Sequence, residues 1–309
     1  MTKKYFIFSL LIVVNIGNVN NLSATALAKN DTKLPFSSGE TLHYLLSYRG
    51  LLSSMIWADI ADVKMQFIAN KLTPEQQNGH QFVLNLTTKN YTKAEIIHPV
   101  RYTYTATMDE ALHRTLLVEK FDKGASQSHE FLWLDWQNKE TFLFKKRKKQ
   151  LISNGFFGTD EKQVWEKDGK RGIPDFLSDF PLLDSKQTYL VHKKNGSKIE
   201  NSQILEPLSM IYRLRSLDLH TKKNIQLIIS EKIRNYTIER VGLEQIGSIG
   251  KKYQAIKYKV LRVGKQDKIF YIWLSNDKLK IPLRFAVDAP LGKLQIQLVK
   301  ITAAETLAL

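Results

Sequence analysis

Apolar and polar side chains alternate at every second position along much of this chain, and this pattern restricts its fold more than any other feature. In the clearest segment, residues 100–108, apolar and aromatic residues alternate with Arg and Thr. Such alternation is typical of a β-strand with one buried face. The connections between successive segments are short, which favours antiparallel pairing because parallel pairs need long crossovers. Strands are also predicted at residues 41–49, 61–67, 82–86, 131–136, 141–144, 225–229, 236–243, 253–263, 268–275, 283–288 and 294–301.

One helix interrupts the strands. Glu206 and Pro207 precede residues with helical spacing that continue to about Leu217, and Pro is favoured in the first turn of a helix. The run 269–274 is apolar on both faces, so its second face needs a cover. The helix and the stretch 153–196, which has little periodicity, are the available covers.

These features predict a mainly β protein, in which a strongly curved antiparallel sheet forms a half-barrel with one covering helix and a long irregular excursion. We expect residues 29–309 to form a single β-rich domain, with the irregular insertion at about 153–196.

The first 28 residues have the parts of a cleavable secretory leader. Lys3 and Lys4 precede an apolar run at 5–14, and Ala26-Leu27-Ala28 gives the small-x-small pattern for cleavage after about Ala28. The apolar run is half the length of a membrane span, which needs about 20 residues. The chain has no cysteine, so we expect neither a disulfide nor a lipidated cysteine. We predict a periplasmic protein that does not span the membrane.

The formal net charge is +16, of which the leader contributes two positive charges and the remainder +14. In an exported protein this charge favours anionic lipid, lipopolysaccharide or acidic polysaccharide as a partner over nucleic acid. The alternative is that the charge only keeps the protein soluble.

Three segments resemble an exported bacterial family known only as domain of unknown function 3108. They are the opening PFSSGETLHYLLSYRG at 35–50, the helix EPLSMIYRLR at 206–215, and the closing YIWLS, PLR and GKL at 271–275, 282–284 and 292–294. The resemblance covers most of residues 35–301 and implies an exported β protein, with no activity attached. The expected half-barrel is similar to the folds of envelope lipid and lipoprotein carriers, which is a likeness of fold only.

We find no motif for catalysis or metal binding. The seven histidines lack the spacing of zinc ligands, no nucleophile elbow or phosphate-binding loop occurs, and no cofactor is implied. Asp175, Asp179 and Asp184 lie close in sequence, but Asp is common in turns. We therefore expect a protein that is not an enzyme.

Two sets of residues are candidates for ligand binding. Aromatic residues could line a cavity under the curved sheet, or could simply form the core. The basic run at 145–149 could bind anions, or could be a solvated hairpin end that discourages edge pairing. The candidates are Tyr44, Tyr48, Trp57, Tyr104, Tyr212, Trp273, Lys145, Lys146, Arg147, Lys148 and Lys149.

Two functions follow from these observations. The first is non-catalytic binding of an amphipathic or anionic envelope molecule, such as a lipid, lipopolysaccharide or polysaccharide. The alternative is a structural or assembly partner of envelope proteins, which an exposed apolar patch would favour.

Overall fold

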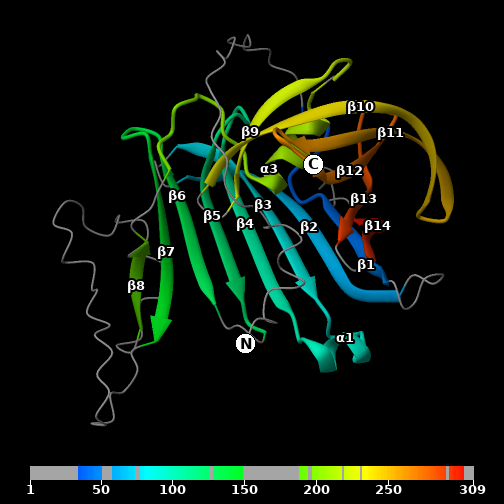
Figure 1. Cartoon of the computed structure of the whole chain (residues 1–309), viewed down its shortest axis with the longest axis horizontal. Helices are drawn as coiled ribbons and strands as arrows, with labels where there is room; N and C mark the ends of the chain where they lie inside the picture. Colours follow the sequence, from blue (N-terminus) through cyan, green and yellow to red (C-terminus); the bar gives the residue numbers. More distant parts are fainter. Residues whose placement is uncertain are drawn as a thin grey trace, which may run out of the picture.

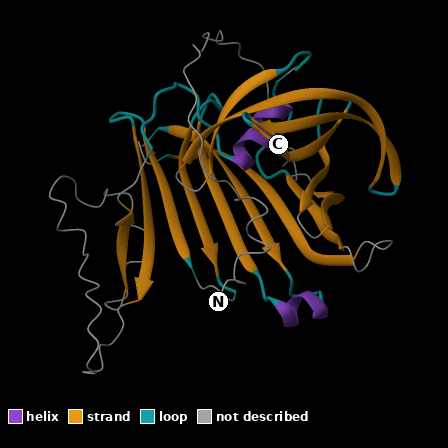
Figure 2. Ribbon diagram, viewed as in Figure 1, coloured by secondary structure: helices purple, strands orange, loops and turns teal. Residues whose placement is uncertain are grey.

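We describe a computed structural model of the protein, which covers residues 34–50, 58–73, 77–124, 128–148, 188–193, 197–217, 219–229, 232–289 and 292–302. Its main body is one antiparallel sheet of 14 strands with two helices (Figures 1 and 2). The strands are β1 (Thr41–Gly50), β2 (Ala58–Leu72), β3 (Asn78–Thr87), β4 (Arg101–Asp109), β5 (Thr115–Asp122), β6 (His129–Asp135), β7 (Glu140–Lys148), β8 (Thr188–Lys193), β9 (Lys223–Ile229), β10 (Lys232–Ser248), β11 (Lys251–Arg262), β12 (Lys265–Ser275), β13 (Pro282–Ala289) and β14 (Gly292–Thr302).

The sheet order is β8-β7-β6-β5-β4-β3-β2-β1-β14-β13-β12-β11-β10-β9. All pairs except one join strands that follow each other in the chain. The exception is β1 with β14, which pair from Thr41 with Thr302 to Gly50 with Gly292. This single long-range pairing joins two meanders, β1–β8 and β9–β14, into one open sheet, and the predicted antiparallel β architecture is confirmed.

Helix α3 (Pro207–Arg215) lies inside the curve of the sheet (Figures 1 and 2). Glu206 caps it, because its carboxylate accepts hydrogen bonds from the backbone N–H of Leu208, at 2.8 Å, and of Ser209. Tyr212 stacks on Phe82 of β3 with ring centroids 4.2 Å apart, so the helix fills the concave side of β2 and β3. The predicted covering helix is therefore confirmed, although it ends at Arg215 and not at Leu217.

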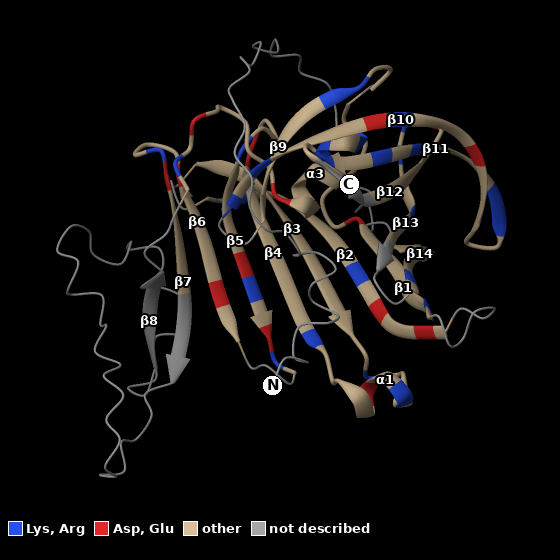
Figure 3. Ribbon diagram, viewed as in Figure 1, with Lys and Arg blue, Asp and Glu red and all other residues tan. Residues whose placement is uncertain are grey.

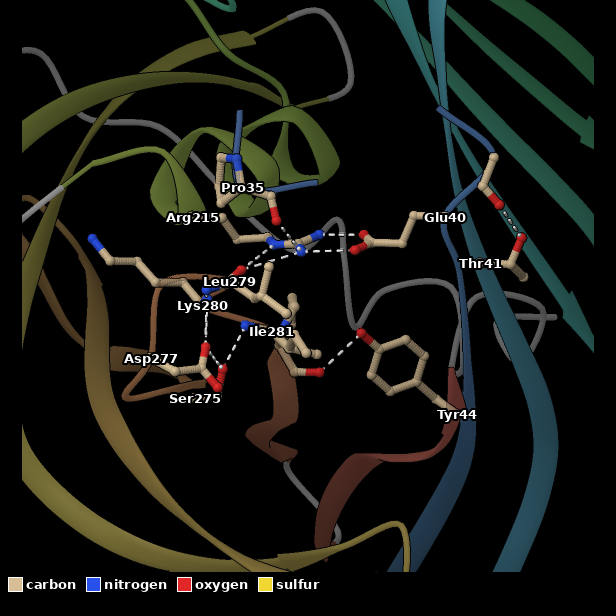
Figure 4. A network of polar contacts seen from close by, with 12 residues as sticks. Pro35, Glu40, Thr41, Tyr44, Arg215, Ser275, Asp277, Leu279, Lys280 and Ile281 are labelled. Atoms are coloured by element: carbon tan, nitrogen blue, oxygen red, sulfur yellow. Dashed lines mark hydrogen bonds and ion pairs between the residues drawn. The ribbon is translucent and has the colours of Figure 1, made fainter. Parts of the chain in front are cut away.

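A buried ion pair fastens the end of α3 to the start of β1 (Figure 4). The guanidinium of Arg215 is fully buried and donates to both oxygens of Glu40, at 2.5 and 2.9 Å. It also donates to the backbone carbonyl of Leu279, in the β12–β13 connection, and lies 4.7 Å from the ring centre of Phe36. Through these contacts, Arg215 connects the end of α3 to the residue before β1 and to the β12–β13 connection.

The second face of β12 has a different cover from the one we predicted. Trp273 on this face is covered by side chains of neighbouring strands of the same sheet. Its indole donates to Glu244 of β10 at 2.7 Å. Lys257 Nζ of β11 lies 5.1 Å from its ring. The turn of the long β10–β11 hairpin (Figure 1) meets β14, where Ser248 Oγ donates to the carbonyl of Leu298 at 2.8 Å.

Three elements differ from the sequence-based expectation. Strand β5 was missed because its residues 115–118 are all buried, so no alternation marks them. Strand β8 lies inside the stretch expected to be irregular and pairs with β7. A short second helix, α1 (Thr92–Ile97), precedes the expected break at Pro99. The leader, residues 149–187 and the aspartates 175, 179 and 184 lie outside the described residues.

We predict that the Arg215–Glu40 pair is required for stability. Replacing Arg215 with Met should lower the free energy of unfolding by about 3–5 kcal/mol, because it leaves a carboxylate near the core without its partner. Urea unfolding of Arg215→Met, Glu40→Gln and the double variant measures this. The double variant should lose less than the sum of the single losses. Additive losses would contradict the coupling of the two groups.

Candidate functional site

The five predicted aromatic residues that the structure describes belong to one apolar cluster or pack against it. Tyr44, Tyr212 and Trp273 are buried within that cluster. Tyr48 and Tyr104 are partly buried and pack against it. The hydroxyl of Tyr44 donates to the backbone carbonyl of Pro282 at 3.0 Å (Figure 4). Trp57 lies outside the described residues.

The basic run lies within a paired strand. Residues 145–148 form the end of β7, and each pairs with a residue of β8, from Lys145 with Val191 to Lys148 with Thr188. The interpretation that this run keeps an exposed edge from pairing is therefore wrong, because β8 occupies that edge. Lys149 lies outside the described residues. The anion-binding interpretation of the run stays a prediction.

A different group of basic residues gathers where α3 meets the β4–β5 turn. Asp109 ends β4, and its carboxylate accepts from the backbone N–H of His113 at 2.7 Å and of Arg114 at 3.0 Å. These two bonds fix the turn and the positions of both basic residues. Arg114 in turn donates to the carbonyl of Ser202 at 3.1 Å and lies 5.0 Å from the ring centre of Trp136.

The segment before α3 places the helix between this turn and β9. The N–H of Thr115, the first residue of β5, donates to the carbonyl of Ile204 at 3.0 Å. Leu205 then bonds on its other side to Gln226 and Ile228 of β9, at 3.1 and 2.8 Å. Arg213 in the last turn of α3 and Lys223 at the start of β9 are thereby brought into the electrostatic environment of His113.

The charges in this group repel one another. Burial, followed by the charge of Arg213, lowers the pKa of Lys223. Burial, followed by the same guanidinium, also lowers the pKa of His113. Burial lowers the pKa of Arg213 itself, while the Asp109 carboxylate opposes that shift. We call His113, Arg114, Arg213 and Lys223 the basic cluster.

Within the described part of the chain, the side chains of His113, Arg213 and Lys223 form no hydrogen bond or ion pair. Half-buried cations without a counter-ion are unfavourable, because they lose hydration without a compensating partner. Elsewhere in the fold such groups are paired: Arg101 with Glu95, and Lys257 with Glu244.

The sequence gives little sign of this group. His113 and Arg114 are separated from Arg213 and Lys223 by about a hundred positions, and no local run of charge marks any of them. The one available signal was Arg213 itself, since a basic residue in the last turn of a predicted helix can be counted before the fold is known. Among the described residues, no group of three or more His, Asp or Glu side chains could hold a metal ion.

Comparison with solved structures returns uncharacterised proteins. A beta-barrel-like protein of the DUF1849 family from Brucella abortus is 8% identical, with 87% of this chain and 99% of that chain covered and a TM-score of 0.45. A candidate lipoprotein from Parabacteroides distasonis ATCC 8503 is also 8% identical, with 88% and 100% covered and a TM-score of 0.30. No curated protein matches the chain.

The family model described as "Protein of unknown function (DUF3108)" matches residues 184–299. This range includes α3 and most of the strands of the second meander, with Arg213 and Lys223 of the basic cluster. It leaves out the opening segment at 35–50, on which part of the resemblance was based. Residues 184–299 of this chain are thus similar to the DUF3108 family, whose function is unknown.

Proposed function

We propose that this protein is a non-catalytic, exported binding protein for an anionic or amphipathic molecule of the bacterial envelope, and that the basic cluster holds the anionic group. The observation that carries the proposal is the presence of half-buried Arg213 and Lys223 side chains that form no ion pair with any described residue, although the Asp109 carboxylate acts on Arg213 without pairing with it. Phosphate or sulfate groups of a lipid, lipopolysaccharide or polysaccharide have the required chemistry.

The geometry favours an oxyanion over a neutral ligand. A guanidinium can bind two oxygens of one phosphate or sulfate group at once, and the ammonium of Lys223 supplies a second charge. A bound anion would also offset the repulsion between Arg213 and Lys223, and the relief of this repulsion would contribute to the binding free energy.

Export is part of this proposal. It is supported by the leader-like first 28 residues. No helix in the described part of the chain has the length and hydropathy needed to cross a membrane.

A role as an assembly partner of envelope proteins is the second candidate. Val241 and Leu243 lie in β10 and are 52% and 47% exposed. Exposed apolar residues of this kind are common at protein contacts. A partner protein that binds β10 in place of a small anion would support this second candidate.

Sulfate tests the basic cluster, because it keeps two charges from pH 5 to pH 8. We expect Arg213→Gln and Lys223→Gln each to weaken sulfate binding about tenfold or more, since hydrogen bonds to charged groups contribute roughly 1.5–3 kcal/mol. Isothermal titration calorimetry measures the affinity. Lys259→Gln, a half-exposed lysine on β11, removes the same charge elsewhere and should bind like the parent protein. Equal losses in all three variants would refute a localised site.

The affinity should depend on pH through His113. Its pKa is lowered from 6.5 in the free protein, so it is neutral at pH 7.5. A bound anion favours the protonated imidazole and raises that pKa again, so sulfate should bind several-fold more tightly at pH 5.5 than at pH 7.5, with proton uptake. The gain should vanish in His113→Gln. A pH dependence that is unchanged in this variant would remove His113 from the site.

Stability in the absence of ligand separates a binding role from a structural one. Arg213→Met removes an unpaired charge and its repulsion with Lys223 while it keeps the aliphatic packing. We expect this variant to be at least as stable as the parent protein in thermal unfolding without sulfate, yet to lose the stabilisation that sulfate gives the parent. Arg240→Met, which removes an arginine of β10 outside the basic cluster, is the control and should keep the stabilisation by sulfate. A clear destabilisation of Arg213→Met would indicate a structural role.

A further inference from the structure

Helix α1 lies between β3 and β4 in the chain and sits beyond the ends of these two strands (Figures 1 and 2). None of its six residues is buried. Ile96 and Ile97 are 78% and 81% exposed, which makes them the two most exposed large apolar side chains among the described residues. A helix normally orients its apolar residues towards the core. This one presents two adjacent isoleucines to the outside.

Polar contacts hold α1 in this position. Arg101 of β4 donates to both oxygens of Glu95, at 2.6 and 3.0 Å. Thr88 also donates to Glu95, and the hydroxyl of Tyr91 donates to Asp62 of β2 at 2.7 Å. The helix is thus fastened to β2 and β4 without using its isoleucines. Their exposure is a consequence of a braced local structure and not of fraying.

The charges around α1 are unequal in their pairing. Glu95 is paired with Arg101, whereas Asp62 accepts from the neutral groups of Asn90 and Tyr91 and keeps its charge. The side chains of Lys89 and Lys93 are exposed and form no hydrogen bond or ion pair with any residue in the described ranges. Figure 3 shows basic and acidic residues together on α1. Lys93 precedes Ile96 and Ile97 by one helical turn, so its positive charge lies beside the isoleucines and favours an anionic partner.

We propose that α1 is a membrane-contact site, at which Ile96 and Ile97 enter the surface of an anionic lipid bilayer while Lys89 and Lys93 meet its headgroups. Exposed apolar side chains next to free lysines match the boundary between headgroups and acyl chains. A helix that projects from the sheet can reach the flat surface of a bilayer, whereas a small ligand would need a groove to enclose it. The site is independent of the basic cluster, because α1 precedes β4 and the β4–β5 turn lies at the other end of that strand.

The absence of cysteine allows a test that reports on this position alone. The full-length protein carrying Ile97→Cys is labelled with an environment-sensitive fluorophore and mixed with phosphatidylglycerol vesicles. We expect a blue shift of the emission, which is weaker with phosphatidylcholine vesicles and at high salt. The same label at Leu243→Cys, on β10, should not shift. Equal shifts at both positions, or none at position 97, would overturn the proposal.

Vesicle affinity provides the second measurement. Ile96→Ser combined with Ile97→Ser should reduce binding to phosphatidylglycerol vesicles in co-sedimentation by at least about tenfold, from the loss of two buried apolar side chains. Val241→Ser with Leu243→Ser removes comparable exposed apolar side chains elsewhere and should bind as the parent does. Thermal unfolding confirms that both variants fold. Undiminished vesicle binding by the α1 variant would refute the membrane assignment. If a protein partner were also captured at α1, that helix would be a protein contact and not a membrane contact.

Discussion

The pairing of β1 with β14 is the constraint on which the rest of this structure depends. Every other pair in the sheet joins strands that are consecutive among the described elements, and most of these strands have a short connection that lets them pair locally. Only the first and last strands must meet across almost the whole sequence. The Arg215–Glu40 ion pair acts at the same junction, because Glu40 immediately precedes β1 and Arg215 also contacts the β12–β13 connection. The pairing that joins the two meanders therefore also fixes the position of α3.

The position of α3 has a functional consequence. Backbone bonds from Ile204 to Thr115 and from Leu205 to Gln226 hold the segment before the helix between the two meanders. The helix thus carries Arg213 from the second meander to a turn of the first. The basic cluster is a product of this junction and could not form within either meander alone.

Much of the fold could be predicted from the sequence, and the reasons for the failures are physical. Strands with one solvated face, such as β4, leave a period of two in the sequence. Strand β5 leaves none because both of its faces are covered. The cap and first turn of α3 were predictable from Glu206 and Pro207. The basic cluster was not, because its members are near in space only through the β1–β14 pairing and the docking of α3.

Two arginines of α3 differ in how their charges are matched by the rest of the protein. Arg215 is buried, and its charge is matched by Glu40 and by the carbonyl of Leu279. Arg213 lies two residues earlier and is half-buried, but it has no such partner in the described part of the chain and is near Lys223. The same helix therefore holds one arginine whose charge is paired and another whose charge has no such pair. The carboxylate of Asp109 acts on Arg213 without pairing with it, and this contrast with Arg215 supports the proposal that Arg213 binds an anion from outside the protein.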